Sequence, residues 1–293
     1  MENSSKIKNQ ELHAILNLLF LAKKLDLSGN KPDFLHRRIS RRMSVTKTNN
    51  HQEYLAYLQN NSLEIEALQD ILTINVSHFF RNSFTFDYLD KIIIPKIINT
   101  KLKAKKPVLR IWSAGCSTGE EAYSIGILID NYLRKNDLIM DVSIFATDID
   151  IKSLAYAKKG KYTAESLKET KLEIITNYFS QLEGKYKILP RIKKMVHFST
   201  FDLLNSHQYA PEESIYGDFD LIFCRNVLIY FNKEYQEIIF NKLNKSMNTT
   251  SLLVLGEAEE PPGEYEKRFH KESIYFKIYQ KTQALTANLK FVQ

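Results

Sequence analysis

Hydrophobic positions divide the chain into two parts with different periods. In the first part, apolar side chains recur every three or four positions, which predicts helices at 11–24, 34–43, 52–58, 62–74 and 84–98. Pro95 lies inside the last of these and predicts a kink or break there. From residue 108 onward, short apolar runs alternate with helix-period segments, which is typical of a mostly parallel α/β sheet.

The second part contains six apolar runs that we interpret as strands, at 108–113, 142–147, 195–199, 219–224, 251–256 and 273–279. Helices are predicted between them at 120–133, 151–158 and 233–247. The last two strands lie close together in the sequence, which favours an antiparallel pair at the edge of the sheet. The aromatic-rich interval before 195 is too long for a structureless loop and predicts a small inserted subdomain, either a hairpin or a three-stranded sheet.

These patterns predict an α/β protein with a separate helical part. We expect a small all-helical N-terminal domain at 1–100, a basic linker at 101–106 and an α/β domain at 107–285. The insertion is expected at about 160–194, with turns at Gly160 and Gly184.

Composition narrows the class of protein. The 293 residues are 44% hydrophobic and 26% charged, which is typical of a soluble globular chain and excludes a fully disordered one. The longest apolar run is too short to span a membrane, and the first residues do not resemble a secretion signal. Two cysteines give no disulfide framework and no metal-type spacing, so we expect a cytoplasmic protein without a structural metal.

The charge balance is basic, with 41 Lys and Arg against 34 Asp and Glu and a net charge of +7. Such a balance favours an anionic partner, whether nucleic acid, anionic lipid or an acidic protein surface, although solvated lysine-rich helices also sum to this value. Four arginines share one face of the predicted helix near 34–44, and they are Arg37, Arg38, Arg41 and Arg42.

A strand, a loop of small residues and a helix follow one another at 111–124 (IWSAGCSTGEEAYS). Gly115 and Gly119 allow the backbone to approach a ligand closely. The spacing is neither a dinucleotide fingerprint nor a phosphate loop. Glu120 and Glu121 stand where a phosphate would bind, and they favour a cationic ligand instead. The alternative is an ordinary glycine turn before a helix with an acidic first turn.

Acidic residues also follow the second strand, at 146–150 (ATDID). Asp148 lies where a carboxylate holds ribose hydroxyls in open α/β sheets. Asp150 is a candidate helix cap, which is compatible with ribose binding by Asp148. Together with the glutamates, this position suggests a nucleoside with a positive centre, and S-adenosylmethionine with its sulfonium is such a molecule.

Two further segments carry clustered polar and aromatic residues. The segment 75–81 (NVSHFFR) lies outside the α/β part, and 224–231 (CRNVLIYF) follows the fourth parallel strand. An Arg, an Asn and a Tyr after a strand lie where open sheets bind ligands. Local hydrogen bonding at a strand-to-helix turn is the alternative interpretation of each segment.

In this order, the segments 37–39, 75–81, 112–121, 146–150 and 224–231 resemble the chemotaxis receptor methyltransferases, the CheR family. The resemblance extends from about residue 11 to residue 280. It implies a helical N-terminal domain followed by a Rossmann-like S-adenosylmethionine-dependent methyltransferase domain with an inserted small antiparallel β-subdomain. It also implies an enzyme that methylates glutamate side chains of chemoreceptors, a protein-glutamate O-methyltransferase.

The resemblance further implies which residues hold the cofactor, S-adenosyl-L-methionine. Those expected to bind it are Asn75, Ser77, Arg81, Glu121, Asp148, Asp202, Leu203, Arg225 and Asn226. Among them, Glu121 would hold the methionine amino end, Asp148 the ribose, and the segment at Asp202 the adenine. Arg81 and Tyr230 would lie nearest the reacting methyl group, as the catalytic residues. Ser77 stands where the family usually has Thr, and Asp202 where Asn is common.

The implied partner is the cytoplasmic helical domain of chemoreceptors. An acidic receptor helix would dock on the four arginines, and the inserted subdomain would offer a β edge to a receptor tail. A methyltransferase acting on RNA or a small molecule is the rival enzyme, since the basic face also suits phosphates, but no base-methylation motif of the Asn-Pro-Pro-Tyr or Cys type is present. A binding-only module is the second rival, and it would be favoured if Glu121, Asp148 or Arg81 were missing. We therefore expect no nucleic acid partner and no direct membrane insertion.

Overall fold

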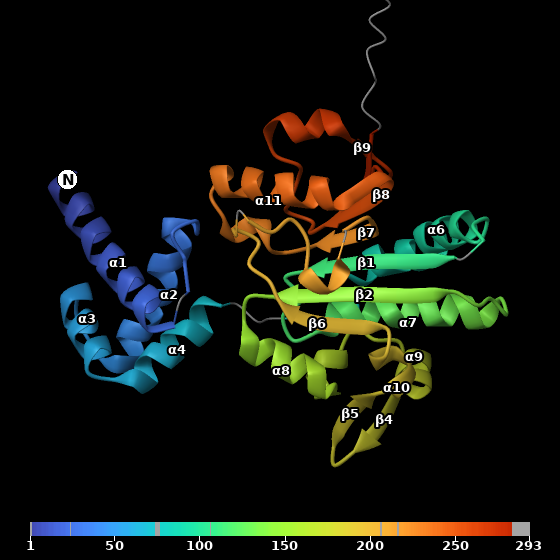
Figure 1. Cartoon of the computed structure of the whole chain (residues 1–293). Coiled ribbons are helices and arrows are strands. Elements are labelled where there is room, and N and C mark those ends of the chain that lie inside the picture. Colours follow the sequence, from blue (N-terminus) through green and yellow to red (C-terminus); the bar gives the residue numbers. More distant parts are fainter. Residues whose placement is uncertain are drawn as a thin grey trace, which may run out of the picture. The chain divides into compact units, whose positions relative to one another are not determined.

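The computed structural model describes residues 2–23, 25–73, 77–105, 107–205, 207–215 and 217–282 (Figure 1). Contacts between residues divide the chain into two compact units. The helical unit contains the described residues of 1–75 together with Tyr230–Tyr235, and the sheet unit contains the other described residues. Within the described part of the chain, no helix is both long enough and apolar enough to cross a bilayer.

The helical unit is built from α1 (Glu2–Lys23), α2 (Pro32–Thr46), α3 (His51–Gln59) and α4 (Ser62–Leu72). Asn50 and Asn61 begin α3 and α4, and their side chains accept hydrogen bonds from the third residue of each helix, as N-cap residues do. The apolar faces of the four helices meet in one core, with these side chains fully buried: Ile15, Leu19, Ile39, Tyr54, Leu58 and Leu68. The predicted all-helical N-terminal domain is confirmed.

A segment from late in the sequence, Tyr230–Tyr235, is part of the helical unit. The backbone N–H of Lys31 donates to the carbonyl of Tyr230 at 2.9 Å, and Asn232 donates to the carbonyl of Gly29 at 3.0 Å. A Cβ at Gly29 would lie 2.6 Å from the ring of Tyr235, so only glycine allows this approach. The segment is therefore fixed to the loop that precedes α2.

The sheet unit contains a seven-stranded sheet in the order β6-β2-β1-β7-β8-β10-β9 (Figure 1). Its strands are β1 (Val108–Ala114), β2 (Asp141–Asp148), β6 (Val196–Thr200), β7 (Phe219–Cys224), β8 (Met247–Leu255), β9 (Phe269–Lys271) and β10 (Ile278–Lys281). The first five in spatial order are parallel, and β10 is antiparallel to both β8 and β9. The predicted α/β class is confirmed, including the antiparallel edge.

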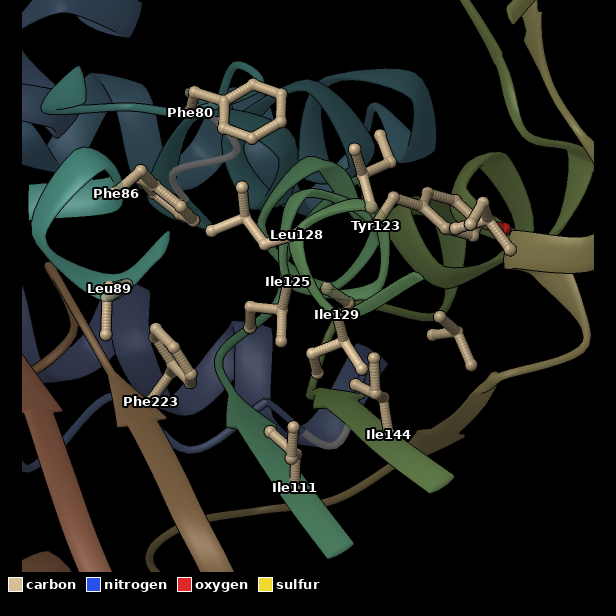
Figure 2. Packing of buried hydrophobic residues seen from close by; sticks show 14 of the residues in the cluster. Phe80, Phe86, Leu89, Ile111, Tyr123, Ile125, Leu128, Ile129, Ile144 and Phe223 are labelled. Atoms are coloured by element: carbon tan, nitrogen blue, oxygen red, sulfur yellow. The ribbon is translucent and has the colours of Figure 1, made fainter. Parts of the chain in front are cut away.

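Helices of the sheet unit bury their apolar faces against the strands. The longer elements are α5 (Ser83–Tyr88), the π-helical turn η1 (Leu89–Ile93), α6 (Ile94–Lys101), α7 (Glu120–Lys135), α8 (Ile151–Lys159) and α11 (Lys233–Ser246). Figure 2 shows side chains of α7 facing those of the strands, with Ile125 and Ile129 near Ile111 and Ile144. Phe86 and Leu89 pack into the same cluster, which binds α5 and η1 to the sheet unit.

The break predicted at Pro95 is confirmed, and one domain boundary differs from the expectation. The predicted helix at 84–98 is interrupted by η1, which ends two residues before Pro95, because proline has no N–H for the helical hydrogen bond and its ring crowds the preceding turn. The contacts also divide the chain near residue 75 rather than at the expected boundary of 100. The buried cluster explains this division, since Ile93, Ile94 and Ile98 belong to the core of the sheet unit.

The insertion between α8 and β6 is a three-stranded antiparallel sheet in the order β3-β5-β4. Its strands are β3 (Lys161–Tyr162), β4 (Phe179–Leu182) and β5 (Lys185–Ile188), and its helices are η2 (Glu165–Leu167), α9 (Leu172–Tyr178) and α10 (Pro190–Lys193). Glu183 and Gly184 both have positive φ, which matches the tight two-residue turn between β4 and β5. Of the two predicted forms, the three-stranded sheet is the one observed.

The strand predicted at 273–279 is wrong in its first part. Residues 272–277 form the connection between β9 and β10, and only Ile278 and Tyr279 pair within the sheet. The hydroxyl of Ser273 accepts hydrogen bonds from the N–H groups of Tyr275 and Phe276 and so closes a turn. The turn contains two exposed apolar residues, Ile274 and Tyr275. Residues of these types are common in strands, which is why the sequence predicted a strand here.

Candidate functional site

Four residues predicted for the site lie just beyond the carboxyl ends of neighbouring parallel strands. Glu121 is in the first turn of α7 after β1, Asp148 ends β2, Asp202 follows β6 and Arg225 follows β7. Because β6, β2, β1 and β7 are adjacent in the sheet, these residues share one edge. This is the edge at which open α/β sheets bind their ligands.

The loop from β1 to α7 is folded tightly against the end of β2. The N–H of Cys116 donates to the carbonyl of Thr147 at 2.9 Å, and the N–H of Ser117 donates to Oδ2 of Asp148 at 2.7 Å. Gly119 has a φ of +90°, and a Cβ there would lie 2.8 Å from the Cβ of Ala157. The loop therefore needs glycine both for its backbone and for packing, which supports the predicted close turn.

Asp148 and Asp150 have different roles in the fold. Oδ1 of Asp150 accepts the N–H of Lys152 at 2.9 Å and Oδ2 accepts the hydroxyl of Ser153 at 2.8 Å, so Asp150 caps α8. Asp148 accepts backbone N–H groups from Ser117 and Asp150. Burial raises the pKa of Asp148 despite these two hydrogen bonds. A ligand that donates hydrogen bonds to Asp148 would therefore stabilise its ionised form.

Glu120 and Glu121 begin α7 and are both enclosed by protein. Oε1 of Glu121 accepts the hydroxyl of Ser113 at 2.8 Å, and Oε2 lies 3.3 Å from Nη1 of Arg225. Burial raises the pKa of Glu121, while the charge of Arg225 opposes the rise. Burial likewise raises the pKa of Glu120, which hydrogen bonds from Thr118 and from the predicted site residue Ser77 oppose.

Arg225 joins the end of β7 to the turn that precedes α5. Its Nη2 donates to the carbonyl of Arg81 and to Oδ1 of Asn82, each at 2.9 Å, and its guanidinium lies 5.3 Å from the ring centre of Phe86. Its Nε is buried and has no hydrogen-bond partner among the residues described. Arg225 thus brings the predicted residue Arg81 to the same edge as Glu121.

The adenine segment predicted after β6 is held by a lysine that the sequence did not reveal. Oδ1 of Asp202 accepts the N–H of Leu204 at 2.8 Å and closes a turn around Leu203, which is buried. Nζ of Lys242 donates to the carbonyls of Asp202 at 3.1 Å and Asn205 at 2.6 Å. Burial lowers the pKa of Lys242 to about 8, against the opposing charge of Asp202.

Glu259 is the second residue that sequence reasoning missed. Its side chain is buried, and it accepts hydrogen bonds from the backbone of the segment that begins at the predicted residue Asn226. The run 257–260 (EAEE) is typical of a solvated turn, and nothing in its pattern distinguishes Glu259 from Glu257, which is exposed.

The remaining predicted residues are not at the carboxyl ends of these strands. Asn75 lies outside the described residues. Tyr230 belongs to the helical unit, where its ring packs on Phe34 with centroids 5.2 Å apart. On α2, Arg42 forms two hydrogen bonds to Glu64, at 2.9 and 2.6 Å.

The other three arginines of α2 differ from Arg42 in their surroundings. Arg38 is half-buried and lies over the ring of Phe34, at 5.7 Å from its centre. Arg37 and Arg41 are exposed, one helical turn apart on the same face. They are the two charges of the predicted basic face that a partner can reach most directly.

Comparison with known proteins identifies both parts of the chain. The family model described as CheR methyltransferase, SAM binding domain, matches residues 75–277, and the model described as CheR methyltransferase, all-alpha domain, matches residues 10–73. A chemotaxis protein methyltransferase of Borreliella burgdorferi is 31% identical over 92% of this chain and 95% of its own length. Namesakes from Listeria innocua and Salmonella typhimurium are 32% and 31% identical, over 80% and 86% of this chain and 84% of each relative.

Proposed function

Because the chain belongs to the CheR family of methyltransferases, we propose that it transfers a methyl group from S-adenosylmethionine to glutamate side chains of chemoreceptors. The products would be glutamyl methyl esters on the receptor and S-adenosylhomocysteine. The observation that carries the proposal is the pair of partly buried carboxylates, Glu121 and Asp148, at the ligand-binding edge of the sheet.

The carboxylates and the arginine at this edge fit the polar groups of S-adenosylmethionine. The ligand has an ammonium group, a sulfonium and two ribose hydroxyls, and carboxylates pair with all of these groups. In our proposal Glu121 pairs with the ammonium and Asp148 accepts the ribose hydroxyls. The buried Nε of Arg225, which lacks a partner among the described residues, is a donor suited to the ligand's carboxylate. Asp202 and Leu203 would border the adenine, and Asn75, Ser77, Arg81 and Asn226 would complete the site.

The proposed chemistry makes few demands on the protein. When bound, the cofactor supplies an electrophilic methyl group on its sulfonium. A glutamate carboxylate, with an ordinary pKa of about 4.3, is already ionised at neutral pH, so no residue has to remove a proton from it. The protein's part is to align the acceptor oxygen and to exclude water. We assign that alignment to Arg81 and Tyr230, with Arg81 acting mainly on the ligand carboxylate so that it does not quench the nucleophile.

The proposed partner is the cytoplasmic helical domain of a chemoreceptor, which also locates the enzyme in the cytoplasm. Arg37 and Arg41 would attract its acidic face, with Arg38 and Arg42 adding to the field. The three-stranded sheet has β4 as an outer strand, and the outer edge of such a strand suits an extended receptor tail.

Transfer of labelled methyl from S-adenosylmethionine to membranes that hold the organism's own chemoreceptors tests the proposal. We expect label on receptor bands that is released as methanol in mild base, because carboxyl esters hydrolyse there and N-methyl groups do not. Receptor membranes in which the candidate glutamates are replaced by glutamine serve as the matched control. Cofactor binding by calorimetry without any transfer to receptors would contradict the proposed substrate, and base-stable label would contradict the proposed ester.

A further inference from the structure

Glu259 lies in a pocket of backbone N–H groups at the end of β7. The residue is 3% exposed. Oε2 accepts the N–H groups of Asn226 at 2.9 Å and Gly256 at 2.6 Å, and Oε1 accepts those of Val227 at 2.8 Å and Ile229 at 3.3 Å. Four donors therefore converge on one carboxylate, which is the arrangement that stabilises a buried negative charge.

The backbone around this carboxylate has little freedom. Asn226 has a φ of +58°, in the left-handed region, which asparagine adopts more readily than most other non-glycine residues. A Cβ at Gly256 would lie 2.7 Å from Oε2 of Glu259 and 2.9 Å from the backbone N of Asn226. Glycine at 256 is thus required for the carboxylate to reach the segment, and the hydrogen bonds of the carboxylate hold Asn226 in its left-handed conformation.

The segment that Glu259 holds, 226–229, contains a residue of the proposed site. Asn226, whose backbone Glu259 holds, is adjacent to Arg225, which contacts Glu121. The charge of Glu259 is also close enough to add to the rise that burial causes in the pKa of Glu121. Glu259 therefore acts on the ligand edge through geometry, by fixing Asn226, and through its field, by strengthening the preference for a cation.

We infer that Glu259 is a positioning residue for cofactor binding, which holds Asn226 in its left-handed conformation at the end of β7. The inference rests on the proposed function, because Asn226 is a cofactor residue only in that proposal. Glu259 itself need not touch the ligand.

The test is calorimetric titration of the full chain with S-adenosylhomocysteine. E259Q keeps the shape of the side chain but turns an NH2 group toward backbone donors, so we expect the dissociation constant to rise about tenfold. E257Q is the matched control, since Glu257 is exposed two residues away, and its affinity should equal that of the wild type. E259Q should change affinity less in an N226A background than in the wild type, because the part of the effect that Asn226 transmits is absent there and only the effect of the charge remains.

A second variant tests the inference if E259Q does not fold. G256A keeps the carboxylate but pushes it and Asn226 apart, and it should also weaken binding. Thermal melting accompanies each titration. Wild-type affinity in a folded E259Q or G256A protein, or an equal loss with and without Asn226, would overturn the positioning role. A wild-type protein that does not bind the ligand would instead overturn the proposed function itself.

Discussion

Arg225 and Glu121 form an ion pair in which Nη1 and Oε2 are 3.3 Å apart, with side-chain exposures of 2% and 13%. The two residues come from different strand ends, and their contact ties the loop after β7 to the first turn of α7. Glu120 is buried and Asp148 is partly buried at the same edge, so three carboxyl groups lie there with two arginines, Arg225 and the adjacent Arg81. The excess of negative charge favours a ligand with a cationic centre.

Replacement of Glu121 by glutamine tests this charge excess. E121Q removes the carboxylate that we propose pairs with the ligand ammonium, and it leaves Arg225 without its ionic partner. Loss of one member of a buried charged contact costs about 2 kcal/mol or more, which corresponds to at least about a thirtyfold weaker affinity. Calorimetry with S-adenosylhomocysteine measures this, and E173Q, at an exposed position on α9, is the control. An E121Q affinity within twofold of the wild type would contradict the assignment.

Cofactor affinity should fall as the pH is lowered through the raised pKa of Glu121, which lies above 4.5. A raised carboxyl pKa means that the folded protein holds the proton more tightly than the unfolded chain, so ionisation of Glu121 lowers stability at neutral pH and protonation relieves that cost. A cationic ligand needs the ionised form. Binding should therefore release protons near this pKa, which calorimetry in two buffers of different ionisation enthalpy detects. The release should shrink in E121Q, and an identical release in that variant would refute the link.

The positions of Glu121 and Asp148 could be predicted because they depend on local order. Alternation of strands and helices predicts a parallel sheet, and residues that directly follow its strands must meet at one edge. Glu259 and Lys242 could not be predicted in this way. Lys242 contacts the carbonyl of Asp202, 40 residues away, and Glu259 contacts Asn226 at a separation of 33 residues. Glu259 lies in a run of glutamates and Lys242 in a helix that carries other lysines, and only the tertiary fold shows that these two side chains are buried.

The same limit applies to the arginines of α2, whose periodicity predicts one basic face. The fold divides them, because Arg42 is paired with the buried Glu64, from 22 residues later in the chain. Although burial opposes it, the hydrogen bonds from Arg42 and Tyr54 lower the pKa of Glu64, so the pair stabilises the helical unit. R42A should therefore lower the free energy of unfolding by about 2 kcal/mol or more, as measured by urea denaturation. R41A should leave it nearly unchanged, and equal losses would contradict this division.

Charge reversal at the two exposed arginines tests receptor docking. R37E/R41E should raise the KM for receptor about tenfold at low ionic strength, because it replaces attraction of an acidic helix by repulsion. The difference should shrink in high salt, and the dissociation constant for S-adenosylhomocysteine should not change. Methyl transfer assays over a range of receptor concentrations measure this.

The control for that experiment is K103E/K105E, which makes the same change in net charge at two exposed lysines of the sheet unit. If both double variants raise KM equally, the total charge of the protein and not the basic face of α2 governs docking. Loss of cofactor affinity in R37E/R41E would indicate misfolding instead.

For Lys242, the pH dependence of ligand affinity separates the role of the charge from the role of the side-chain length. Its ammonium donates to the carbonyls of Asp202 and Asn205 and lies over the ring of Phe201, at 4.8 Å from its centre. K242M keeps the length of the side chain but removes both hydrogen bonds from the proposed adenine segment. We expect about a tenfold weaker affinity for S-adenosylhomocysteine at neutral pH, because the loss of two hydrogen bonds to the segment costs about 1 to 2 kcal/mol. K245M, at an exposed position on α11, is the matched control.

The pKa of about 8 for Lys242 fixes how this difference changes with pH. The unfolded chain keeps its proton up to about 10.5, so between these values deprotonation of the folded protein relieves the cost of burying the charge, and folding stability rises with pH. The hydrogen bonds to the carbonyls weaken over the same range, because a neutral amine is the poorer donor. The affinity ratio between wild type and K242M should therefore decrease from pH 7 to pH 9. A ratio that stays constant over this range would mean that the length of the side chain, and not its charge, holds the segment.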